Sequence, residues 1–399
     1  MKERARYILV CAGEDSGDSI GESLVKAIVV DARFEAVGAG GIRMQNAGLC
    51  SLVEYEILPV SGFGDVVPRY FKLRQSFNQL KTALESPNCV GLIAIDYPGF
   101  NMKLVALAGK LRKPALYVAP PQVWAWKRKR AKELVKNPFV KLAVFFDFEE
   151  TVYKDAGCNV VRVIHPFVNS EFGIRSSELY FEWHETLHGI AETETVSSQR
   201  CLLLPGSRKF QALRNLPLFL KAVQMARKSP VISRMDITLL AARQELVEVF
   251  EKGLRQFGDE DLLRKIHVEV SPTDANERRA VYRGAILALT APGTATLELA
   301  LSGCSMIVCT KPDVLTYGLA RIFIKTRYFA LPNIILDKLA YPEMICAPGK
   351  ESRTVKSLAQ EIVTQCISKQ NPDMDILYSK ISAGMSLEQL ALEFLGQFV

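Results

Sequence analysis

The sequence lacks several features that would place it in common protein classes. No apolar run reaches the roughly 18 residues that a helix needs to cross a bilayer, and neither an internal repeat nor a low-complexity segment is present. The nine cysteines show no paired CxxC spacing, and the first ten residues, MKERARYILV, are charged and then strand-like rather than typical of a secretory leader. These absences predict reduced thiols, a cytoplasmic location and, for any membrane contact, a peripheral one.

The excess of positive over negative charge is also small. Lysine and arginine number 50 against 43 aspartates and glutamates, so the formal net charge is +7. This mild excess suits anionic substrates or an anionic lipid surface, but it is far below that of a nucleic-acid-binding tail, and no nucleic-acid partner is expected. With 399 residues, of which 49% are hydrophobic, the chain is long enough for about two ordinary domains.

Short apolar runs alternate with helical patterns along the chain, which is typical of parallel sheets covered by helices. The predicted strands are 7–12, 90–95, 115–118 and 142–146 in the first half, and 201–204, 236–241, 267–270, 285–289 and 306–309 in the second. We therefore predict an α/β fold of two doubly wound, Rossmann-like domains that face a cleft. Ligands in such folds bind beyond the carboxyl ends of the strands.

The domain limits follow from the same rhythm. We expect an N-terminal domain over residues 1–168, a polar linker region over 169–200, and a second domain over 201–353. Helical patterns over 354–399 close the chain.

Two loops of the first half carry carboxylates. AGEDSGD, residues 12–18, follows the first strand, and its Ser16 and Asp18 suit hydrogen bonds to sugar hydroxyls; the alternative is a plain turn in which Asp18 or Ser19 caps the next helix. IDYPGFN, residues 95–101, places Asp96 at the carboxyl end of a buried strand. Asp96 is a candidate general base, and a local cap of the turn is the alternative.

Two loops of the second half suit a nucleotide. LLLPGSR, residues 202–208, is a strand followed by a glycine turn, and Arg208 with the free amides of the next helix predicts an anion site for a pyrophosphate. TAPGTATLE, residues 290–298, repeats this pattern of a strand, a glycine turn and a helix start. Thr294 and Thr296 offer hydroxyls, or act as simple caps, and Glu298 could accept hydrogen bonds from a ribose.

Two motifs resemble metal sites but are better explained otherwise. HETLH, residues 184–188, matches the zinc-peptidase pattern, yet it lies in the polar linker region without a third ligand nearby. DMD, residues 373–375, opens a terminal helix, where capping accounts for its acids. No metal and no other cofactor is expected.

In this order the loops resemble those of the lipid-A-disaccharide synthase family. The resemblance covers most of the chain. Beyond the four loops above, it is carried by GAGGIRMQNAG at 38–48, YVAPPQVWAWK at 117–127, HPF at 165–167, LPNII at 331–335 and YPEMI at 341–345. The chain departs from the family pattern at Asp15, Gln211, Pro292 and Cys346.

The resemblance implies an inverting glycosyltransferase of the two-domain GT-B fold. Its donor would be UDP-2,3-diacylglucosamine and its acceptor lipid X, 2,3-diacylglucosamine 1-phosphate. The products would be the β-1,6-linked lipid A disaccharide 1-phosphate and UDP. The resemblance also implies association with the inner membrane, and C-terminal helices that return to the N-terminal domain or to the partner in a homodimer. Two alternatives stay open: a UDP-N-acetylglucosamine epimerase, and a non-catalytic nucleotide-sugar or lipid-binding relative.

Site roles follow from the motifs and the resemblance together. Asp96 is the expected base, Glu14 the second choice, and Arg208 the group that stabilises the departing UDP. The donor is expected to contact Gly206, Ser207, Arg208, Gly293, Thr294, Thr296, Glu298, Asn333 and Glu343. The acceptor is expected to contact Ser16, Asp18, Asn101, Trp124 and Trp126.

Trp124 and Trp126 lie beside four cations, Lys127–Arg130, which also suits nucleic acid or a membrane surface. We favour the wall of a substrate cleft, because no other basic and aromatic cluster supports nucleic-acid binding. Residues 61–77 mix apolar groups with cations and could contact a membrane, or form a core helix with a basic edge. The expected membrane contacts are Phe63, Val66, Val67, Arg69, Phe71 and Lys72, whereas Tyr70, Leu73, Phe77 and Leu80 have the spacing of a core-facing stripe.

Overall fold

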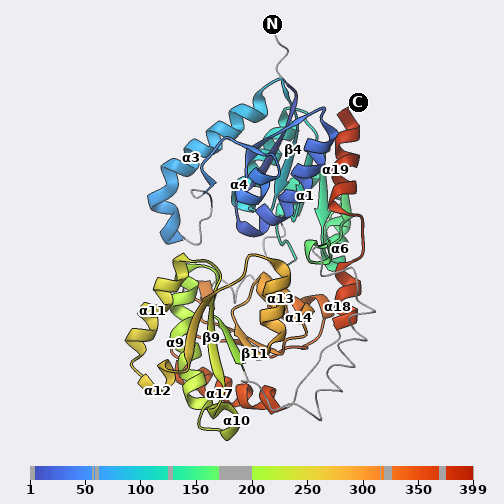
Figure 1. Cartoon of the computed structure of the whole chain (residues 1–399). Coiled ribbons are helices and arrows are strands. Elements are labelled where there is room, and N and C mark those ends of the chain that lie inside the picture. Colours follow the sequence, from blue (N-terminus) through green and yellow to red (C-terminus); the bar gives the residue numbers. More distant parts are fainter. Residues whose placement is uncertain are drawn as a thin grey trace. The chain divides into compact units, whose positions relative to one another are not determined.

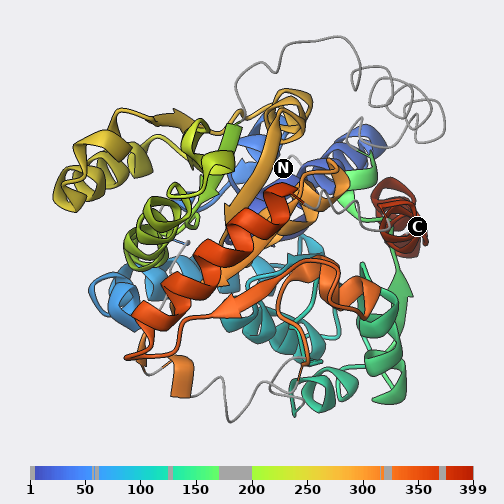
Figure 2. The ribbon, with the colours of Figure 1, turned by 90° about the horizontal axis from the view of Figure 1, so that it is seen from below.

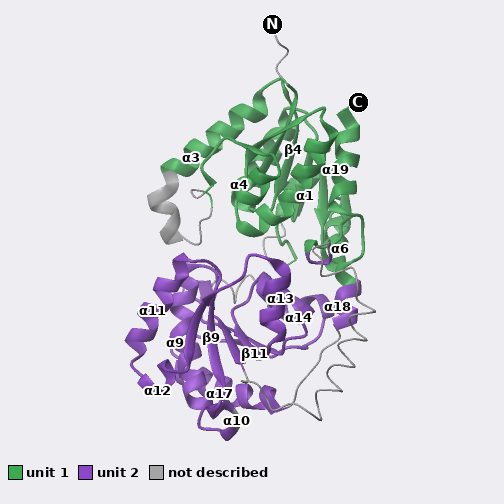
Figure 3. Cartoon of the chain, in the orientation of Figure 1, with its two compact units in different colours: residues 1–166, 380–399 green, residues 167–379 purple. Residues whose placement is uncertain are grey.

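The computed structural model describes residues 5–55, 58, 63–124, 129–169, 200–314, 316–318, 326–367 and 374–398, without the side chains of 63–70, 169 and 231. The chain divides into two compact units (Figure 3). Unit 1 comprises residues 1–166 and 380–399, and unit 2 comprises residues 167–379. The expected first boundary at 168 thus lies two residues beyond the observed one.

Unit 1 is built on a seven-stranded parallel sheet in the order β3-β2-β1-β4-β5-β6-β7. The order runs outward in both directions from β1 and β4, so the loops after these two strands lie side by side at the carboxyl edge of the sheet. The strands are β1 (Tyr7–Ala12), β2 (Glu35–Ala39), β3 (Cys50–Ser51), β4 (Cys89–Ile95), β5 (Ala115–Val118), β6 (Val140–Val144) and β7 (Val160–Arg162).

Helices cover both faces of this sheet, as continuous apolar strands require. Leu9 and Cys11 of β1 share a core with Leu80 of α3, Leu104 of α4 and Leu134 of α5. On the other face α1 packs against α19, as Figure 1 shows. The helices of unit 1 are α1 (Asp15–Asp31), α2 (Ile42–Asn46), α3 (Phe63–Glu85), α4 (Pro98–Lys110), α5 (Lys129–Val135), α6 (Asp147–Asp155), α19 (Leu387–Leu395) and the 3-10 helix η2 (Gly396–Phe398).

Unit 2 repeats the plan with a six-stranded parallel sheet in the order β10-β9-β8-β11-β12-β13. Here the order runs outward from β8 and β11, so the loops after these strands are the neighbours at the carboxyl edge. The strands are β8 (Arg200–Leu204), β9 (Asp236–Ala241), β10 (Ile266–Val270), β11 (Ala285–Thr290), β12 (Met306–Thr310) and β13 (Glu343–Ile345).

One face of the second sheet carries α9, α11 and α17, whose apolar residues join those of β8, β9, β11 and β12 in one core. Elsewhere α14 packs against β11, β12, α13 and α16. The helices are α9 (Lys209–Ala226), α10 (Pro230–Ser233), α11 (Glu245–Phe257), α12 (Glu260–Leu263), α13 (Ala275–Arg283), α14 (Thr294–Leu301), α16 (Leu331–Leu336) and α17 (Glu351–Ile367). Two further helices, α7 (Pro166–Asn169) and α18 (Met374–Ile381), contain the points where the chain passes from one unit to the other.

The C-terminal helices differ from the expectation that all of 354–399 leaves the second domain. Helix α17 lies alongside α9 (Figure 2) and buries Val355, Leu358 and Ile362 in the core of unit 2. The chain from Lys380 onward belongs to unit 1. There Gly91 of β4 leaves room for the end of the chain, because a Cβ at this position would lie 2.8 Å from the ring of Phe398.

The predicted strands agree closely with the observed ones. Strands 7–12, 115–118 and 236–241 are confirmed at both ends. Strand 142–146 lies two residues too late, because Phe145 and Phe146 already form the turn into α6. Both parallel sheets therefore confirm the predicted α/β class. In the described residues, no helix combines the length and the apolarity that crossing a bilayer requires.

The expected membrane stretch forms the first part of α3. The side chains of Phe63, Val66, Val67 and Arg69 lie outside the described residues. Phe71 is 79% exposed and Lys72 is exposed, whereas Leu80 is buried in the core. Leu73 and Phe77 pack against that core, as predicted.

Candidate active site

The loop after β1 begins α1 and also fixes α2. Glu14 takes an extended conformation and is the N-cap of α1, which starts at Asp15 rather than near residue 20. The buried Asp18 side chain accepts hydrogen bonds from the backbone amides of Arg43 and Met44, both at 3.1 Å. Asp18 therefore caps α2 rather than its own helix, and its contact with the acceptor stays a prediction. Ser16 is half-buried in the same turn.

Asp96 lies where β4 ends and is held firmly by its backbone. Its φ of 45° and the φ of 50° at Tyr97 place two consecutive residues in the left-handed region, which few non-glycine residues adopt. The Asp96 amide donates to the carbonyl oxygen of Val118 at 2.9 Å, and the Tyr117 hydroxyl donates to the Asp96 carbonyl oxygen at 3.1 Å. These hydrogen bonds fix the backbone that carries the half-buried Asp96 side chain at the carboxyl edge of the sheet.

Asn101 secures this strand end rather than reaching outward. Its side chain is fully buried, and its Nδ2 lies 3.1, 3.0 and 2.9 Å from the carbonyl oxygens of Cys11, Ile95 and Asp96. The amide therefore joins the ends of β1 and β4. The contact expected between Asn101 and the acceptor stays a prediction.

Trp124 lies after β5 in the segment that leads to α5, and it has a partner that the motifs did not reveal. Its Nε1 donates to Oε1 of Glu149 at 3.2 Å. Glu149 belongs to α6 and is only 7% exposed, and this burial raises the pKa of its carboxyl to about 7. A lone glutamate in a helical pattern gives no sequence signal of such burial. Trp126 lies outside the described residues.

The loop after β8 presents backbone amides at the start of α9. Gly206 has φ of 136°, and a Cβ there would lie 2.6 Å from Oε1 of Gln211, so this turn needs glycine. Asn215 is fully buried and anchors the loop by donating to the Pro205 carbonyl oxygen at 2.8 Å. Ser207 and Arg208 are exposed at the mouth of the helix, as the anion-site prediction requires.

In the loop after β11, the two threonines of the predicted donor site differ in their exposure to solvent. Thr296 is buried, and its hydroxyl donates to the Gly293 carbonyl oxygen at 2.7 Å, which is the capping alternative. Thr294 is exposed together with Gly293 at the start of α14. Thr294 and the amides of this turn are therefore accessible to a ligand, and a donor contact of Thr296 stays a prediction.

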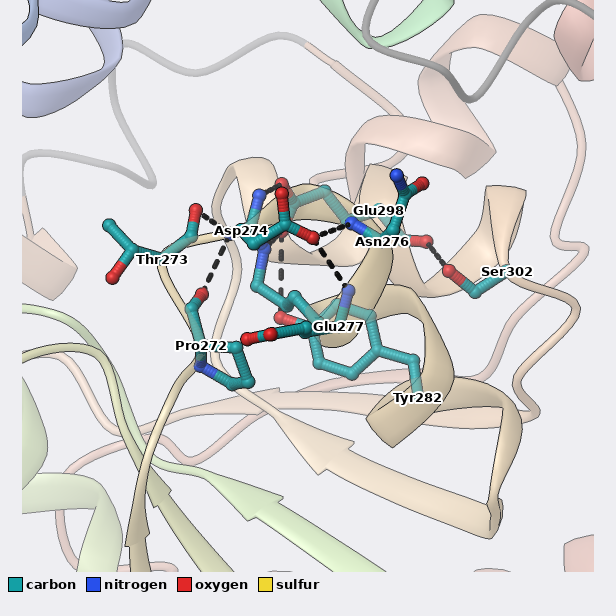
Figure 4. Close-up of polar contacts among 9 residues, drawn as sticks. Pro272, Thr273, Asp274, Asn276, Glu277, Tyr282, Glu298 and Ser302 are labelled. Carbon is teal, nitrogen blue, oxygen red and sulfur yellow. Dashed lines mark hydrogen bonds and ion pairs between the residues drawn. The ribbon is translucent and has the colours of Figure 1, made fainter.

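Glu298 forms a buried ion pair instead of a free acceptor. Its two carboxylate oxygens lie 2.7 Å from Nη2 and 3.1 Å from Nε of Arg278. Arg278 also donates to the carbonyl oxygens of Pro272 and Thr273 at 2.9 and 3.2 Å. Figure 4 shows these carbonyls and Glu298 around the start of α13. Arg278 holds the loop after β10 against α14, and no sequence motif singles it out.

Asp274 gives α13 its start. Its side chain accepts from the amides of Asn276 at 2.9 Å and Glu277 at 3.0 Å (Figure 4). These hydrogen bonds hold the pKa of the Asp274 carboxyl below its usual range, with the bond from Glu277 as the larger cause. The cap fixes the turn from which Arg278 reaches Glu298.

Asn333 and Glu343 are occupied by the backbone of their own motif. The fully buried Asn333 donates to the Tyr341 carbonyl oxygen at 2.8 Å and accepts from the Tyr341 amide at 2.9 Å. Glu343 accepts from the Ala330 amide at 2.8 Å and from Asn333 at 3.1 Å. Both side chains thus tie the start of α16 to Tyr341 and β13, and their expected direct contact with the nucleotide stays a prediction.

Cations gather at the carboxyl edge of unit 2. Arg208 follows β8, Arg243 follows β9 and Lys311 follows β12, where Lys311 pairs with Glu351 at 3.2 Å. Arg243 also donates to the Ser207 carbonyl oxygen at 3.2 Å, so it lies directly at the glycine turn. Such an edge favours an anion that carries more than one charge.

The structure describes only part of the two metal-like motifs. HETLH at 184–188 lies outside the described residues, as does Asp373, whereas Asp375 is in the first turn of α18. Within the described ranges, no three or more His, Cys, Asp or Glu side chains are grouped as metal ligands would be.

Known proteins provide the context for these two edges. The model of a family described as lipid-A-disaccharide synthetase matches residues 8–386 of this chain. The chain belongs to this family. A curated lipid-A-disaccharide synthase of Trichlorobacter lovleyi is 31% identical over 363 residues, which are 90% of this chain and 88% of that protein. The resemblance of the motifs is therefore confirmed, and with it the expected class of glycosyltransferase.

Solved structures support the fold of this lipid-A-disaccharide synthase family member. A glycosyltransferase from Rickettsia africae aligns with a TM-score of 0.52 at 11% identity, over 99% of this chain and 98% of that chain. A structure from Listeria monocytogenes that is described as a putative UDP-N-acetylglucosamine 2-epimerase aligns with a TM-score of 0.57 at 12% identity. The alignment covers 98% of this chain and 95% of that chain. At such low identity the likeness shows the GT-B fold alone and gives no support to the epimerase alternative.

Proposed function

We propose that this chain transfers 2,3-diacylglucosamine from UDP-2,3-diacylglucosamine to the 6-hydroxyl of lipid X, with inversion, forming the β-1,6-linked lipid A disaccharide 1-phosphate and UDP. Family membership supports lipid A disaccharide formation. The observation that carries the mechanism is the pair of strand-end loops. In unit 1 they present Asp96, and in unit 2 they present amides and Arg208.

The acceptor hydroxyl needs a base as it attacks. The donor carries an α-linked leaving group, so one in-line displacement gives the β product and the hydroxyl must lose its proton during attack. Asp96 supports this role because its backbone is fixed at the carboxyl edge next to the β1 loop. Glu14, the half-buried N-cap of α1, is the second candidate.

The departing UDP needs stabilisation of charge on its phosphates. The amides at the starts of α9 and α14, together with Arg208, can supply it without rearrangement at the moment of reaction. Arg243 and Lys311 add positive charge at the same edge. Glu298, Asn333 and Glu343 support the fold of this site from beneath, since their side chains are engaged with protein groups.

Both substrates are acylated, so the proposal includes peripheral contact with the anionic inner-membrane surface. The exposed Phe71 beside the exposed Lys72 on α3 supports it, because an apolar group next to a cation suits the interface of an anionic bilayer. Co-sedimentation with anionic vesicles should fall as salt rises. Equal recovery with neutral vesicles at all salt concentrations would contradict this part. A homodimer stays a prediction, which light scattering can test.

The proposed function has a direct assay. Purified protein incubated with both diacylated sugars should yield the disaccharide 1-phosphate, identified by mass spectrometry, and one UDP for each disaccharide. UDP release should require lipid X. A UDP-N-acetylglucosamine epimerase would instead convert UDP-N-acetylglucosamine without any lipid, and a non-catalytic relative would bind its ligands without releasing UDP.

A further inference from the structure

The loop after β5 is tied to α6 at two points. Glu149 and Tyr153 lie four residues apart on α6 and therefore on one face of the helix. Glu149 accepts from Trp124 Nε1 at 3.2 Å, and the Tyr153 hydroxyl donates to the Pro121 carbonyl oxygen at 2.5 Å. The loop that leads to Trp124 is thus held by one rigid element. The rings of Trp124 and Phe148 also pack edge to face, with centroids 5.1 Å apart.

This loop lies next to Asp96. Strands β4 and β5 are neighbours in the sheet, and the Asp96 amide bonds to Val118, the last residue of β5. Ala119, directly after β5, has φ of 50°, an unfavourable conformation that the surrounding contacts must maintain. The Trp124 indole, half-buried, therefore belongs to the same carboxyl edge as the proposed base.

Glu149 could be a helix cap and nothing more. It is the third residue of α6, and its Oε2 accepts from the Phe145 amide at 3.3 Å, so part of its role is local. A cap needs no buried partner from another strand, however. The second oxygen is directed to the indole, and the carboxyl is buried although a surface glutamate would cap equally well.

We propose that Glu149 is a positioning residue for the acceptor. Its carboxylate holds the indole of Trp124 in the orientation that forms one wall of the acceptor-sugar subsite beside Asp96. A fixed aromatic ring suits the apolar face of a glucosamine, and holding it in advance lowers the cost of ordering the sugar for attack. This inference rests on the proposed function, in which unit 1 binds the acceptor.

The charged and titratable groups near Glu149 come from several elements. Asp96 follows β4, and its charge acts on Glu149; Tyr153 lies on the same helix face. Arg130 of α5 acts on Tyr153 and on Tyr117 of β5. His165 stacks on Phe146, which begins α6, and burial lowers the pKa of this imidazole to about 3, so it stays neutral. Of these groups, Asp96 is the one whose ionisation would work against that of Glu149.

The test uses binding, so it does not depend on turnover. The dissociation constants of lipid X in detergent micelles and of UDP are measured separately by calorimetry for Glu149→Met, Trp124→Phe and the double variant. Methionine has a similar length but cannot accept from the indole. Each single variant should weaken lipid X binding by about tenfold, because the ring loses its fixed orientation, with UDP binding within about twofold of wild type. The double variant should be no worse than either single variant, because both remove one interaction.

The matched control is Glu150→Gln. Glu150 lies on the same helix, one residue further, and pairs with Lys154 at 2.8 Å on the surface. This change removes one carboxylate without touching Trp124, so lipid X binding should stay at the wild-type value. Glu149→Gln keeps an oxygen that can accept from the indole and should restore most of the lipid X affinity that Glu149→Met loses.

Several outcomes would overturn the inference. Unchanged lipid X binding in Trp124→Phe, additive losses in the double variant, or equal weakening of lipid X and UDP would each do so. If Glu149→Met does not fold, Trp124→Phe alone decides, since it leaves the carboxylate in place. If the wild-type protein binds lipid X but forms no disaccharide, the proposed function is wrong. If the wild-type protein forms the disaccharide and the variants bind lipid X as it does, only this inference is wrong.

Discussion

The two units share one topology but carry opposite charges at their carboxyl edges. In unit 1 the loops after β1 and β4 bring Glu14, Asp15 and Asp96 together, with Glu149 buried close by. In unit 2 the loops after β8, β9 and β12 bring Arg208, Arg243 and Lys311. A doubly wound sheet fixes where a ligand binds, and the loop residues decide which chemistry takes place there. Proton removal suits the first edge and a diphosphate suits the second.

The largest expected effect comes from the carboxyl edge of unit 1, here called the acidic edge, which contains Asp96; the corresponding edge of unit 2 with Arg208 is called the basic edge. Asp96→Asn preserves the size of the side chain but removes the base, so kcat for disaccharide formation should fall by about 10³-fold. The rate is measured by UDP release in the presence of lipid X. Glu22→Gln changes a half-buried carboxylate on α1 that pairs with the exposed Lys26 at 2.7 Å, and it should leave kcat unchanged. Full activity of Asp96→Asn would remove Asp96 from the mechanism.

The ion pair beneath the basic edge should matter most for stability. Arg278→Met leaves the Glu298 carboxylate buried without its bidentate partner, which should cost about 3 kcal/mol in the free energy of unfolding. Chemical denaturation measures the loss. The matched control is Arg264→Met, whose pair with Glu260 is exposed and 3.9 Å long, and which should change stability by less than about 0.5 kcal/mol. Equal losses in the two variants would show that burial does not set the value of the pair.

Arg208 tests the basic edge at its exposed surface. Arg208→Ala should weaken donor binding by about tenfold to a hundredfold, because one charged hydrogen-bonding group is lost from the diphosphate. The donor KM, obtained at saturating lipid X, reports this change. Lys221→Ala removes an exposed cation further along α9 and should have no effect. An unchanged donor KM in Arg208→Ala would contradict the pyrophosphate role.

The smallest effect is a pH dependence that only the acidic edge should show. Burial raises the pKa of Glu149 to about 7 from its ordinary 4.5, so the folded protein keeps a proton that the unfolded chain loses between these values. The contribution of Glu149 to the free energy of unfolding should therefore fall as pH rises through this window, by at most about 1.4 kcal/mol per pH unit. The contribution of the buried His165 has the opposite sign, because its lowered pKa makes stability rise with pH up to its ordinary value of 6.5. Glu149→Gln should therefore make the slope of stability against pH more positive than in the wild type, and Glu150→Gln should keep the wild-type slope. The same slope in both variants would exclude Glu149 as its source.

The sequence predicted the fold more fully than the use of individual side chains. Strands such as 115–118 could be found because a buried parallel strand is a short, uninterrupted apolar run. The turns at Gly206 and Gly293 could be found because a strand-glycine-helix pattern requires them. These features are local, and periodicity or a single residue type reports them.

Partners across the fold could not be predicted in the same way. The motifs suggested ligand contacts for Asp18, Asn101 and Asn333, but each side chain bonds to the backbone of its own unit. Conversely, Glu149 and Arg278 lie in ordinary helical patterns, and their burial arises only when distant strands come together. A motif identifies the place of a site, whereas the hydrogen bonds decide which of its polar groups remain available.

The division of labour between the two edges is tested most directly by UDP binding, measured by calorimetry for Asp96→Asn and Arg208→Ala under the same conditions. We predict that Asp96→Asn binds UDP as the wild type does and that Arg208→Ala binds it at least about tenfold more weakly. The reverse order, or equal losses in both variants, would contradict the assignment of proton removal to unit 1 and of the diphosphate to unit 2.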